Sequence, residues 1–291
     1  MIRPLLALAL VAVAPAGAQA PSAPQVAASL SDRFREGRNG WEQALQRGDG
    51  AHVRRALEAV LEREGAAVNS SDYNEMHALV GLRNLVAQAC VVEGAWEDAV
   101  EQLRKASAAA EENAANAAQN LGRVRQQHLD KLAEWKESQA RQEQRLKELE
   151  AQPGLTQAQM KSRTQIKAFL DEQRNAMAHS ERALKSIDDV LAQLKVDRDT
   201  YAKSLAEWQG FLVKEKLEAA QAGSPARYAA EKLEQVKADD ARPRFERIAY
   251  GRRLLRLDPA SPDCRRFVNG LLGIEEPEEA RPAPKKKPRK K

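Results

Sequence analysis

The chain has 291 residues, of which 43% are hydrophobic, 31% are charged and only 4% are aromatic. So few aromatic residues exclude one large core and argue against sandwich and α/β folds, whereas this composition is typical of long, exposed helices. The net charge is +5, but it is concentrated at the C-terminus: without Arg3 and residues 275–291, 39 basic residues stand against 38 acidic ones.

Residues 1–20 have the pattern of a secretory signal peptide. Arg3 makes the start positive, residues 5–13 are apolar but too few to span a bilayer, and Ala18-Gln19-Ala20 fits the small-x-small cleavage rule. Residues 21–27, rich in Pro and Ala, are expected to be a mobile start of the mature chain. No later segment has the length and hydropathy of a transmembrane helix. We therefore expect an exported protein, periplasmic or secreted, that is soluble after cleavage.

Residues 28–95 are predicted to form the first part of a helical body. Their apolar residues recur at helical spacing, with breaks predicted at Gly37–Gly40 and at Gly48–Gly50. The polar run over residues 69–72 offers N-cap side chains for a further helix, which is expected to end at Gly94.

The segment that begins at Gly94 resembles the second helix of a tetratricopeptide repeat, in which a glycine turns the chain and small residues let two helices pack closely. The matching residues are Gly94, Trp96, Ala99, Leu103 and Ala106, with Ala87 at the small position of the first helix. Cys90 departs from the pattern, because the family usually has an aromatic residue there. Leu254–Pro259 is similar to the close of such a repeat, so a further helix is expected over Pro262–Leu272. The resemblance implies helical surfaces that contact other proteins.

Residues 96–222 are predicted to form an antiparallel helical hairpin with its turn near residues 151–155. Pro153-Gly154 is a turn signal, and Thr156 with Gln159 makes a capping box for the second helix. Steps of four and three along that helix define a coiled-coil seam of nearly seven heptads. Its members are Ile166, Leu170, Gln173, Met177, Ser180, Leu184, Ile187, Leu191, Leu194, Arg198, Tyr201, Leu205, Trp208 and Leu212. A parallel coiled coil between two copies is the alternative, and a homo-oligomer stays open.

A hairpin returns the chain to the place where it left, so residues 223–274 are expected to complete the body that residues 28–95 begin. The predicted fold class is all-α, with a small repeat-like helical body and a projecting antiparallel coiled-coil hairpin. Trp96 is then expected close to Trp208–Phe211. The same arrangement permits a disulfide between Cys90 and Cys264, with two buried free thiols as the alternative.

The sequence contains no pattern typical of an enzyme. Its four histidines are isolated, and it lacks HExxH, CxxC, a calcium-binding loop, GxSxG and a glycine-rich phosphate loop. We therefore expect no catalytic residue, no metal and no cofactor.

Residues 275–291 form a charged, Pro-rich tail that is expected to be disordered. Six basic residues lie at the end of this tail and are predicted to bind polyanions: Lys285, Lys286, Lys287, Arg289, Lys290 and Lys291. After export, anionic lipid head groups, acidic envelope polymers or an acidic protein would fit this charge. A solubilising tail without a dedicated partner is the alternative.

These features favour a non-enzymatic scaffold or adaptor, in the cell envelope or secreted, that binds unidentified protein partners through helical-repeat and coiled-coil surfaces. The alternative function is an exported module that binds polyanions or an anionic surface through its basic tail. The two hypotheses differ in whether the helices or the tail carry the activity.

Overall fold

The structure of the chain, a computed structural model, describes residues 29–274. The predicted signal peptide, the start at residues 21–27 and the tail at residues 275–291 lie outside the described residues. The part that is described contains helices and no strand, which confirms the predicted all-α class. It divides into two compact units, and we call Ala110–Asp199 unit 2 and the remainder unit 1.

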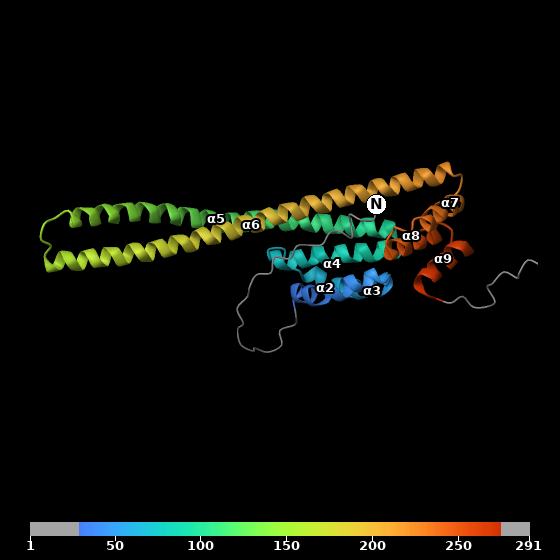
Figure 1. Cartoon of the computed structure of the whole chain (residues 1–291), viewed down its shortest axis with the longest axis horizontal. Coiled ribbons are helices and arrows are strands. Elements are labelled where there is room, and N and C mark those ends of the chain that lie inside the picture. Colours follow the sequence, from blue (N-terminus) through green and yellow to red (C-terminus); the bar gives the residue numbers. More distant parts are fainter. Residues whose placement is uncertain (1–28, 275–291) are drawn as a thin grey trace, which may run out of the picture. The chain divides into compact units, whose positions relative to one another are not determined.

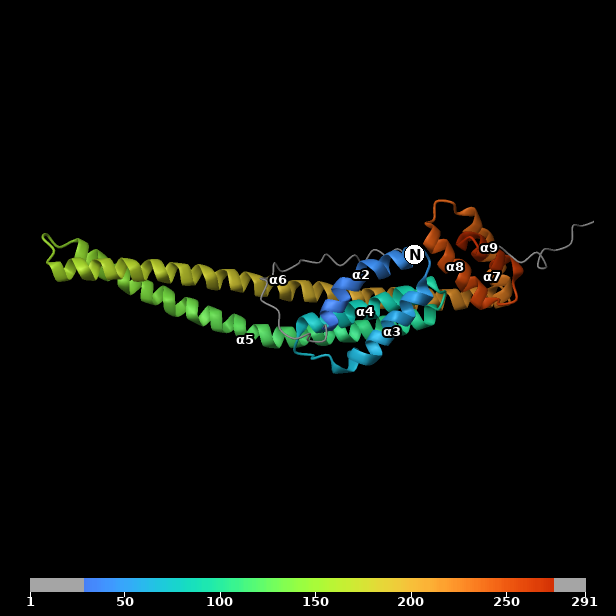
Figure 2. The ribbon, with the colours of Figure 1, turned by 90° about the horizontal axis from the view of Figure 1, so that it is seen from below.

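The N-terminal part of unit 1 consists of helices that pack along one central helix. In chain order they are α2 (Leu30–Gln46), α3 (Gly50–Glu64), the short 3-10 helix η1 (Gly65–Ala67) and α4 (Tyr73–Val92). Helix α4 begins where the polar run predicted it, because the Asp72 side chain accepts hydrogen bonds from the backbone N–H groups of Asn74 and Glu75. Most of α4 is buried, since α2 and α3 lie along it (Figures 1 and 2).

The predicted break at Gly37–Gly40 is wrong, because α2 continues through it. The indole ring of Trp41 lies against Gly37 one turn earlier, where any added Cβ would collide with the ring. A glycine inside a helix costs about 1 kcal/mol relative to alanine. At Gly37 the helix continues nevertheless, because the Trp41 ring occupies the space that a larger side chain would need. The break at Gly48 is confirmed: Gly48 has a φ of 89° between α2 and α3.

The predicted hairpin is confirmed as two long helices, α5 (Trp96–Glu150) and α6 (Gln157–Gln221). At the start of α6 the N–H of Thr156 donates to Gln159 Oε1 at 2.8 Å, and the N–H of Gln159 donates to Thr156 Oγ1 at 3.3 Å. This is the predicted capping box. Within unit 2 the helices run antiparallel and side by side, joined by contacts that include an Arg125–Asp188 ion pair of 2.8 Å (Figure 1).

Every seventh residue along α6 is buried from Ile166 to Glu215, and Leu170, Ser204 and Leu212 between them are buried as well. The residues at the interval of seven are at most 9% exposed: Ile166, Gln173, Ser180, Ile187, Leu194, Tyr201, Trp208 and Glu215. The spacing agrees with the predicted coiled-coil seam, which extends one step further, to a buried charge at Glu215. The division into units differs from the predicted one, because the first turns of α5 and the last turns of α6 belong to unit 1.

The C-terminal helices complete unit 1. They are α7 (Pro225–Ala238), α8 (Arg244–Leu257) and α9 (Pro262–Leu272), and they share a small core of Ala229, Leu233, Leu254 and Cys264. The predicted joining of the two chain ends is confirmed, because the Arg252 guanidinium donates to the carbonyl oxygens of Gly48 and Val92, at 2.8 and 3.1 Å.

Gly94 forms the turn between α4 and α5, and nothing larger fits there. Its φ is 70°, in the left-handed region that glycine tolerates best. In addition, α8 passes so close that a Cβ at this position would collide with the backbone of Arg252 and Arg253. The turn and the approach of α8 therefore depend on the same missing side chain.

We expect Gly94→Ala to lower the free energy of unfolding by more than the roughly 1–3 kcal/mol of left-handed strain alone, because the collision with α8 adds to it. Gly210→Ala is the matched control: Gly210 lies within α6 of the same unit, with open space around it, and alanine there should stabilise by up to about 1 kcal/mol. Urea unfolding followed by circular dichroism measures both. Equal effects of the two substitutions would contradict the close approach of α8.

Candidate functional site

A buried charge cluster in unit 1 centres on Arg253, which is 4% exposed. Its guanidinium donates to the Glu97 carboxylate at 2.6 and 2.7 Å, and its Nε donates to both oxygens of Glu215 at 3.1 Å. Burial by itself would lower the pKa of Arg253, but the hydrogen bonds with Glu97 and Glu215 outweigh it and raise that pKa. Every nitrogen of the guanidinium has an acceptor, so we assign the cluster to holding α5, α6 and α8 together.

The Trp96 side chain packs beside this cluster. Its ring lies 5.9 Å from that of Trp208, 5.1 Å from Phe211 and 5.2 Å from Tyr250, centroid to centroid, which confirms the predicted neighbourhood of Trp96. The Arg253 guanidinium stands 5.2 Å from the Trp96 ring centre, within cation–π range. The Trp96 ring helps to shield the Arg253 guanidinium from water, which strengthens its attraction to the buried Glu215, whereas the Glu97 carboxylate is half-exposed.

Cys90 and Cys264 are both buried free thiols in the structure, which is the alternative named for them above. Cys90 lies on α4, and burial raises the pKa of its thiol to about 12. Cys264 lies at the start of α9 in the core shared with α7 and α8, and burial raises its pKa too. Both groups are therefore neutral thiols at physiological pH. A disulfide between them stays a prediction.

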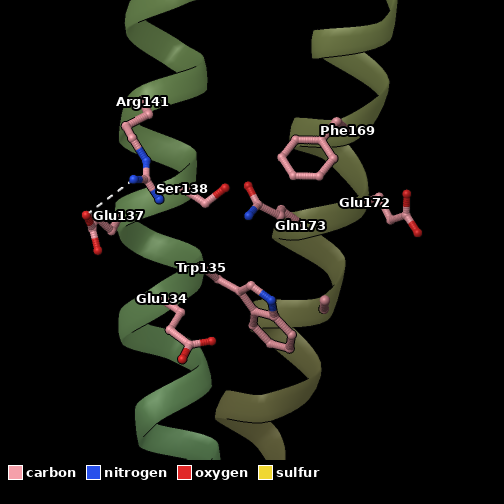
Figure 3. Close-up of a pocket in the computed structure, with 9 residues that line it drawn as sticks. Glu134, Trp135, Glu137, Ser138, Arg141, Phe169, Glu172 and Gln173 are labelled. Carbon is pink, nitrogen blue, oxygen red and sulfur yellow. Dashed lines mark ion pairs between the residues drawn. The ribbon is translucent and has the colours of Figure 1, made fainter.

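A groove of about 620 Å³ lies between α5 and α6 in unit 2. Nine residues line it: Glu134, Trp135, Glu137, Ser138, Arg141, Phe169, Glu172, Gln173 and Ala176. Figure 3 shows Trp135 and Ser138 reaching from α5 toward α6, while Gln173 points back toward Ser138 and the Phe169 ring faces the gap. The groove thus has an aromatic side chain from each helix and a polar centre.

Two features distinguish this groove from an ordinary stretch of coiled coil. Gln173 is only 7% exposed, and its Oε1 has no hydrogen-bond partner among residues 29–274, although a buried polar atom normally has one. The large apolar ring of Phe169 is 41% exposed. A binding partner could cover the exposed ring of Phe169 and offer a donor to the buried, unsatisfied oxygen of Gln173.

The charges around the groove are mostly negative. Glu137 is occupied by an ion pair of 3.6 Å with Arg141, on the outer side of α5 (Figure 3). Glu134 and Glu172 form no ion pair within the described part of the chain. Three carboxylates and one guanidinium therefore leave the rim with a negative balance.

Sequence reasoning missed this groove, although signals for it exist. It placed Gln173 on the seam of the second hairpin helix and treated it as a packing residue. The missed signal is that Trp135 and Phe169 are the only aromatic residues of Ala110–Asp199, and the hairpin brings them to one groove. Phe169 lies outside the predicted seam, so its role was not expected.

The predicted polyanion-binding residues, Lys285 to Lys291, lie outside the described residues. Among residues 29–274, no three or more His, Cys, Asp or Glu side chains gather as a metal site would require. None of the helices in that range has the length and hydropathy of a membrane span. Comparison of the chain with protein-family models, with curated proteins and with solved structures finds no match.

The Glu97–Arg253 pair makes stability depend on pH. The hydrogen bond from Arg253 lowers the pKa of Glu97 in the folded state. The pair therefore stabilises the fold fully at any pH above the unfolded-state pKa of Glu97. This stabilisation is lost as the pH falls through the lower pKa of the folded state. Between neutral pH and about pH 3, the free energy of unfolding should therefore fall less in Glu97→Gln than in the natural chain. Glu111→Gln, at an exposed position on α5, is the control, and an identical pH response of both variants would contradict the pair's role.

The Cys90 thiol should resist alkylation in the folded protein. Its raised pKa keeps the reactive thiolate scarce, and the side chain is 0% exposed. Under non-reducing conditions at mildly alkaline pH, we expect iodoacetamide to modify Cys90 in the folded protein about tenfold more slowly than in the urea-unfolded protein. Peptide mass spectrometry measures the rate, and fast labelling of native protein would contradict the burial.

Proposed function

We propose that this chain is an exported, non-enzymatic adaptor whose hairpin binds a segment of a partner protein in the groove of unit 2. The observation that carries the proposal is the convergence of the only two aromatic residues of unit 2, Trp135 and Phe169, on a groove with a buried acceptor, Gln173 Oε1, that has no hydrogen-bond partner among residues 29–274. Aromatic residues are enriched where proteins bind one another, because they bury a large area with few rotatable bonds.

Energetics favours an occupant over an empty groove. The exposed ring of Phe169 forgoes burial of apolar area, which contributes about 25 cal/mol per Å² when covered. A buried acceptor without a hydrogen bond costs about 1–3 kcal/mol, and a donor from a partner would recover that free energy. A segment that reaches both groups gains from each.

Two sequence features support the rest of the proposal. The signal-peptide pattern of residues 1–20 supports export. The resemblance of the segment from Gly94 to Ala106 to a tetratricopeptide repeat supports a second protein-contacting surface on unit 1.

The second candidate function is binding of a polyanion or an anionic surface through the tail. It is favoured by one sequence observation, the six cations among the last seven residues. In that case the helices would only display the tail.

Photo-cross-linking in intact cells tests the groove. Benzoylphenylalanine placed at Phe169 should cross-link to a discrete partner, and the same group at Lys185, an exposed α6 residue outside the groove, should not. We expect the cross-link from position 169 to disappear with Trp135→Ala, because that substitution removes the opposite side of the groove.

A chain that lacks residues 282–291 separates the two functions. If the groove carries the function, the cross-link from position 169 and the cellular location persist without the tail. A cross-link that is no stronger at position 169 than at position 185 would refute groove docking, and loss of location on tail deletion alone would favour the tail.

A further inference from the structure

From the chemistry of the groove in unit 2 we infer that its ligand is an arginine side chain, presented by a partner segment in which apolar residues flank the arginine. This inference rests on the proposed function, because it names the chemistry of the partner segment that the groove binds. Three properties of the groove carry it: an acceptor, a pair of rings and an excess of carboxylates.

The acceptor lies deep in the groove. Gln173 sits at a buried position of the α6 seam, is 7% exposed, and keeps its Oε1 without a partner among the described residues. Figure 3 shows its side chain directed into the gap between the helices. This oxygen is already shielded from water, so only a hydrogen-bond donor that reaches it recovers the cost of its burial, and a purely apolar occupant does not.

The rings lie on opposite helices. Trp135 comes from α5 and Phe169 from α6, and both line the groove. A planar guanidinium stacks on aromatic faces and is more weakly hydrated than an ammonium group, so it leaves water more easily. Arginine can therefore cover a ring and still offer several N–H donors to nearby oxygens.

The charges select a cation. Glu134 and Glu172 have no ion-pair partner in the part of the chain that the structure describes, and Arg141 is already engaged by Glu137. An anionic ligand would be repelled by this rim, whereas a guanidinium gains from it. The same rim disfavours a second copy of this groove as the occupant, since two negative rims would face each other.

The chain's own tail is a poorer occupant than a partner. Its cations at residues 285–291 are interrupted only by Pro288, so no large apolar side chain flanks them to cover Phe169. A segment with leucines on both sides of one arginine supplies the apolar cover and the guanidinium together.

Binding can be measured on the full mature chain labelled with 5-fluorotryptophan. The chain has four tryptophans, and Trp135→Phe identifies the fluorine signal of Trp135. The probes are the peptides Ac-Ala-Leu-Arg-Leu-Ala-NH2 and its citrulline analogue, which keeps the shape of arginine but not the charge. We expect the arginine peptide to shift the Trp135 signal alone, and the citrulline peptide to bind at least about tenfold more weakly.

Variants assign the effect to the groove. Gln173→Leu and Glu134→Gln should each weaken binding of the arginine peptide by about fivefold to tenfold, since each removes a charge or acceptor that the guanidinium contacts. Leucine suits a coiled-coil seam, so Gln173→Leu keeps the fold, which circular dichroism checks. Glu181→Gln, exposed on α6 outside the groove, is the matched control and should bind normally.

Each other outcome overturns the inference. Equal binding of the citrulline peptide would show that charge is not recognised, and equal shifts of all four tryptophan signals, or none, would show that the groove is not the site. Binding that appears only after removal of residues 275–291 would identify the tail as the occupant. A cross-link from position 169 together with indifference to arginine would leave the proposed adaptor function standing and remove only the arginine.

Discussion

Unit 1 is organised around the buried guanidinium of Arg253. A charge removed from water is tolerated only when its donors reach acceptors and counter-ions lie close. Arg253 meets this requirement with Glu97 at the start of α5 and Glu215 near the end of α6, which lie 156 and 38 residues away along the chain. Its guanidinium also donates to the carbonyl oxygen of Gly94, and the missing side chain of Gly94 lets α8 approach the turn. A displacement of α6 or α8 would separate Arg253 from Glu215 and leave the buried carboxylate of Glu215 without its counter-ion.

The seam of α6 shows three ways in which a polar residue can occupy a buried position. Glu215 has a counter-ion in Arg253, and Ser180 lies 3.1 Å from His128 Nδ1 across the hairpin. Gln173 differs, because its carbonyl oxygen has no partner in the described part of the chain. The exception coincides with the groove that both aromatic residues of unit 2 line. That coincidence links a local imperfection of packing to the proposed binding role.

The sequence by itself determined the features that depend on local chemistry and on periodicity. Capping and turn residues lie within a few positions of each other, so the start of α4, the Pro153-Gly154 turn and the Thr156 cap followed directly from residue types. The heptad spacing identified the buried face of α6, because a helix repeats its faces at a fixed interval. The antiparallel return then placed Trp96 beside Trp208, as the structure has it.

Only the tertiary structure decided how distant side chains combine. The helix continues through Gly37 because the Trp41 ring packs on it, which glycine propensity alone argues against. In the sequence, Glu215 cannot be told apart from the many glutamates on exposed helix faces. The structure shows that it is buried and paired with Arg253. Likewise, Trp135 and Phe169 become one groove only when the register of the two hairpin helices is known. Helical periodicity specifies which residues share a face, whereas the partner across that face depends on packing between segments far apart in the chain.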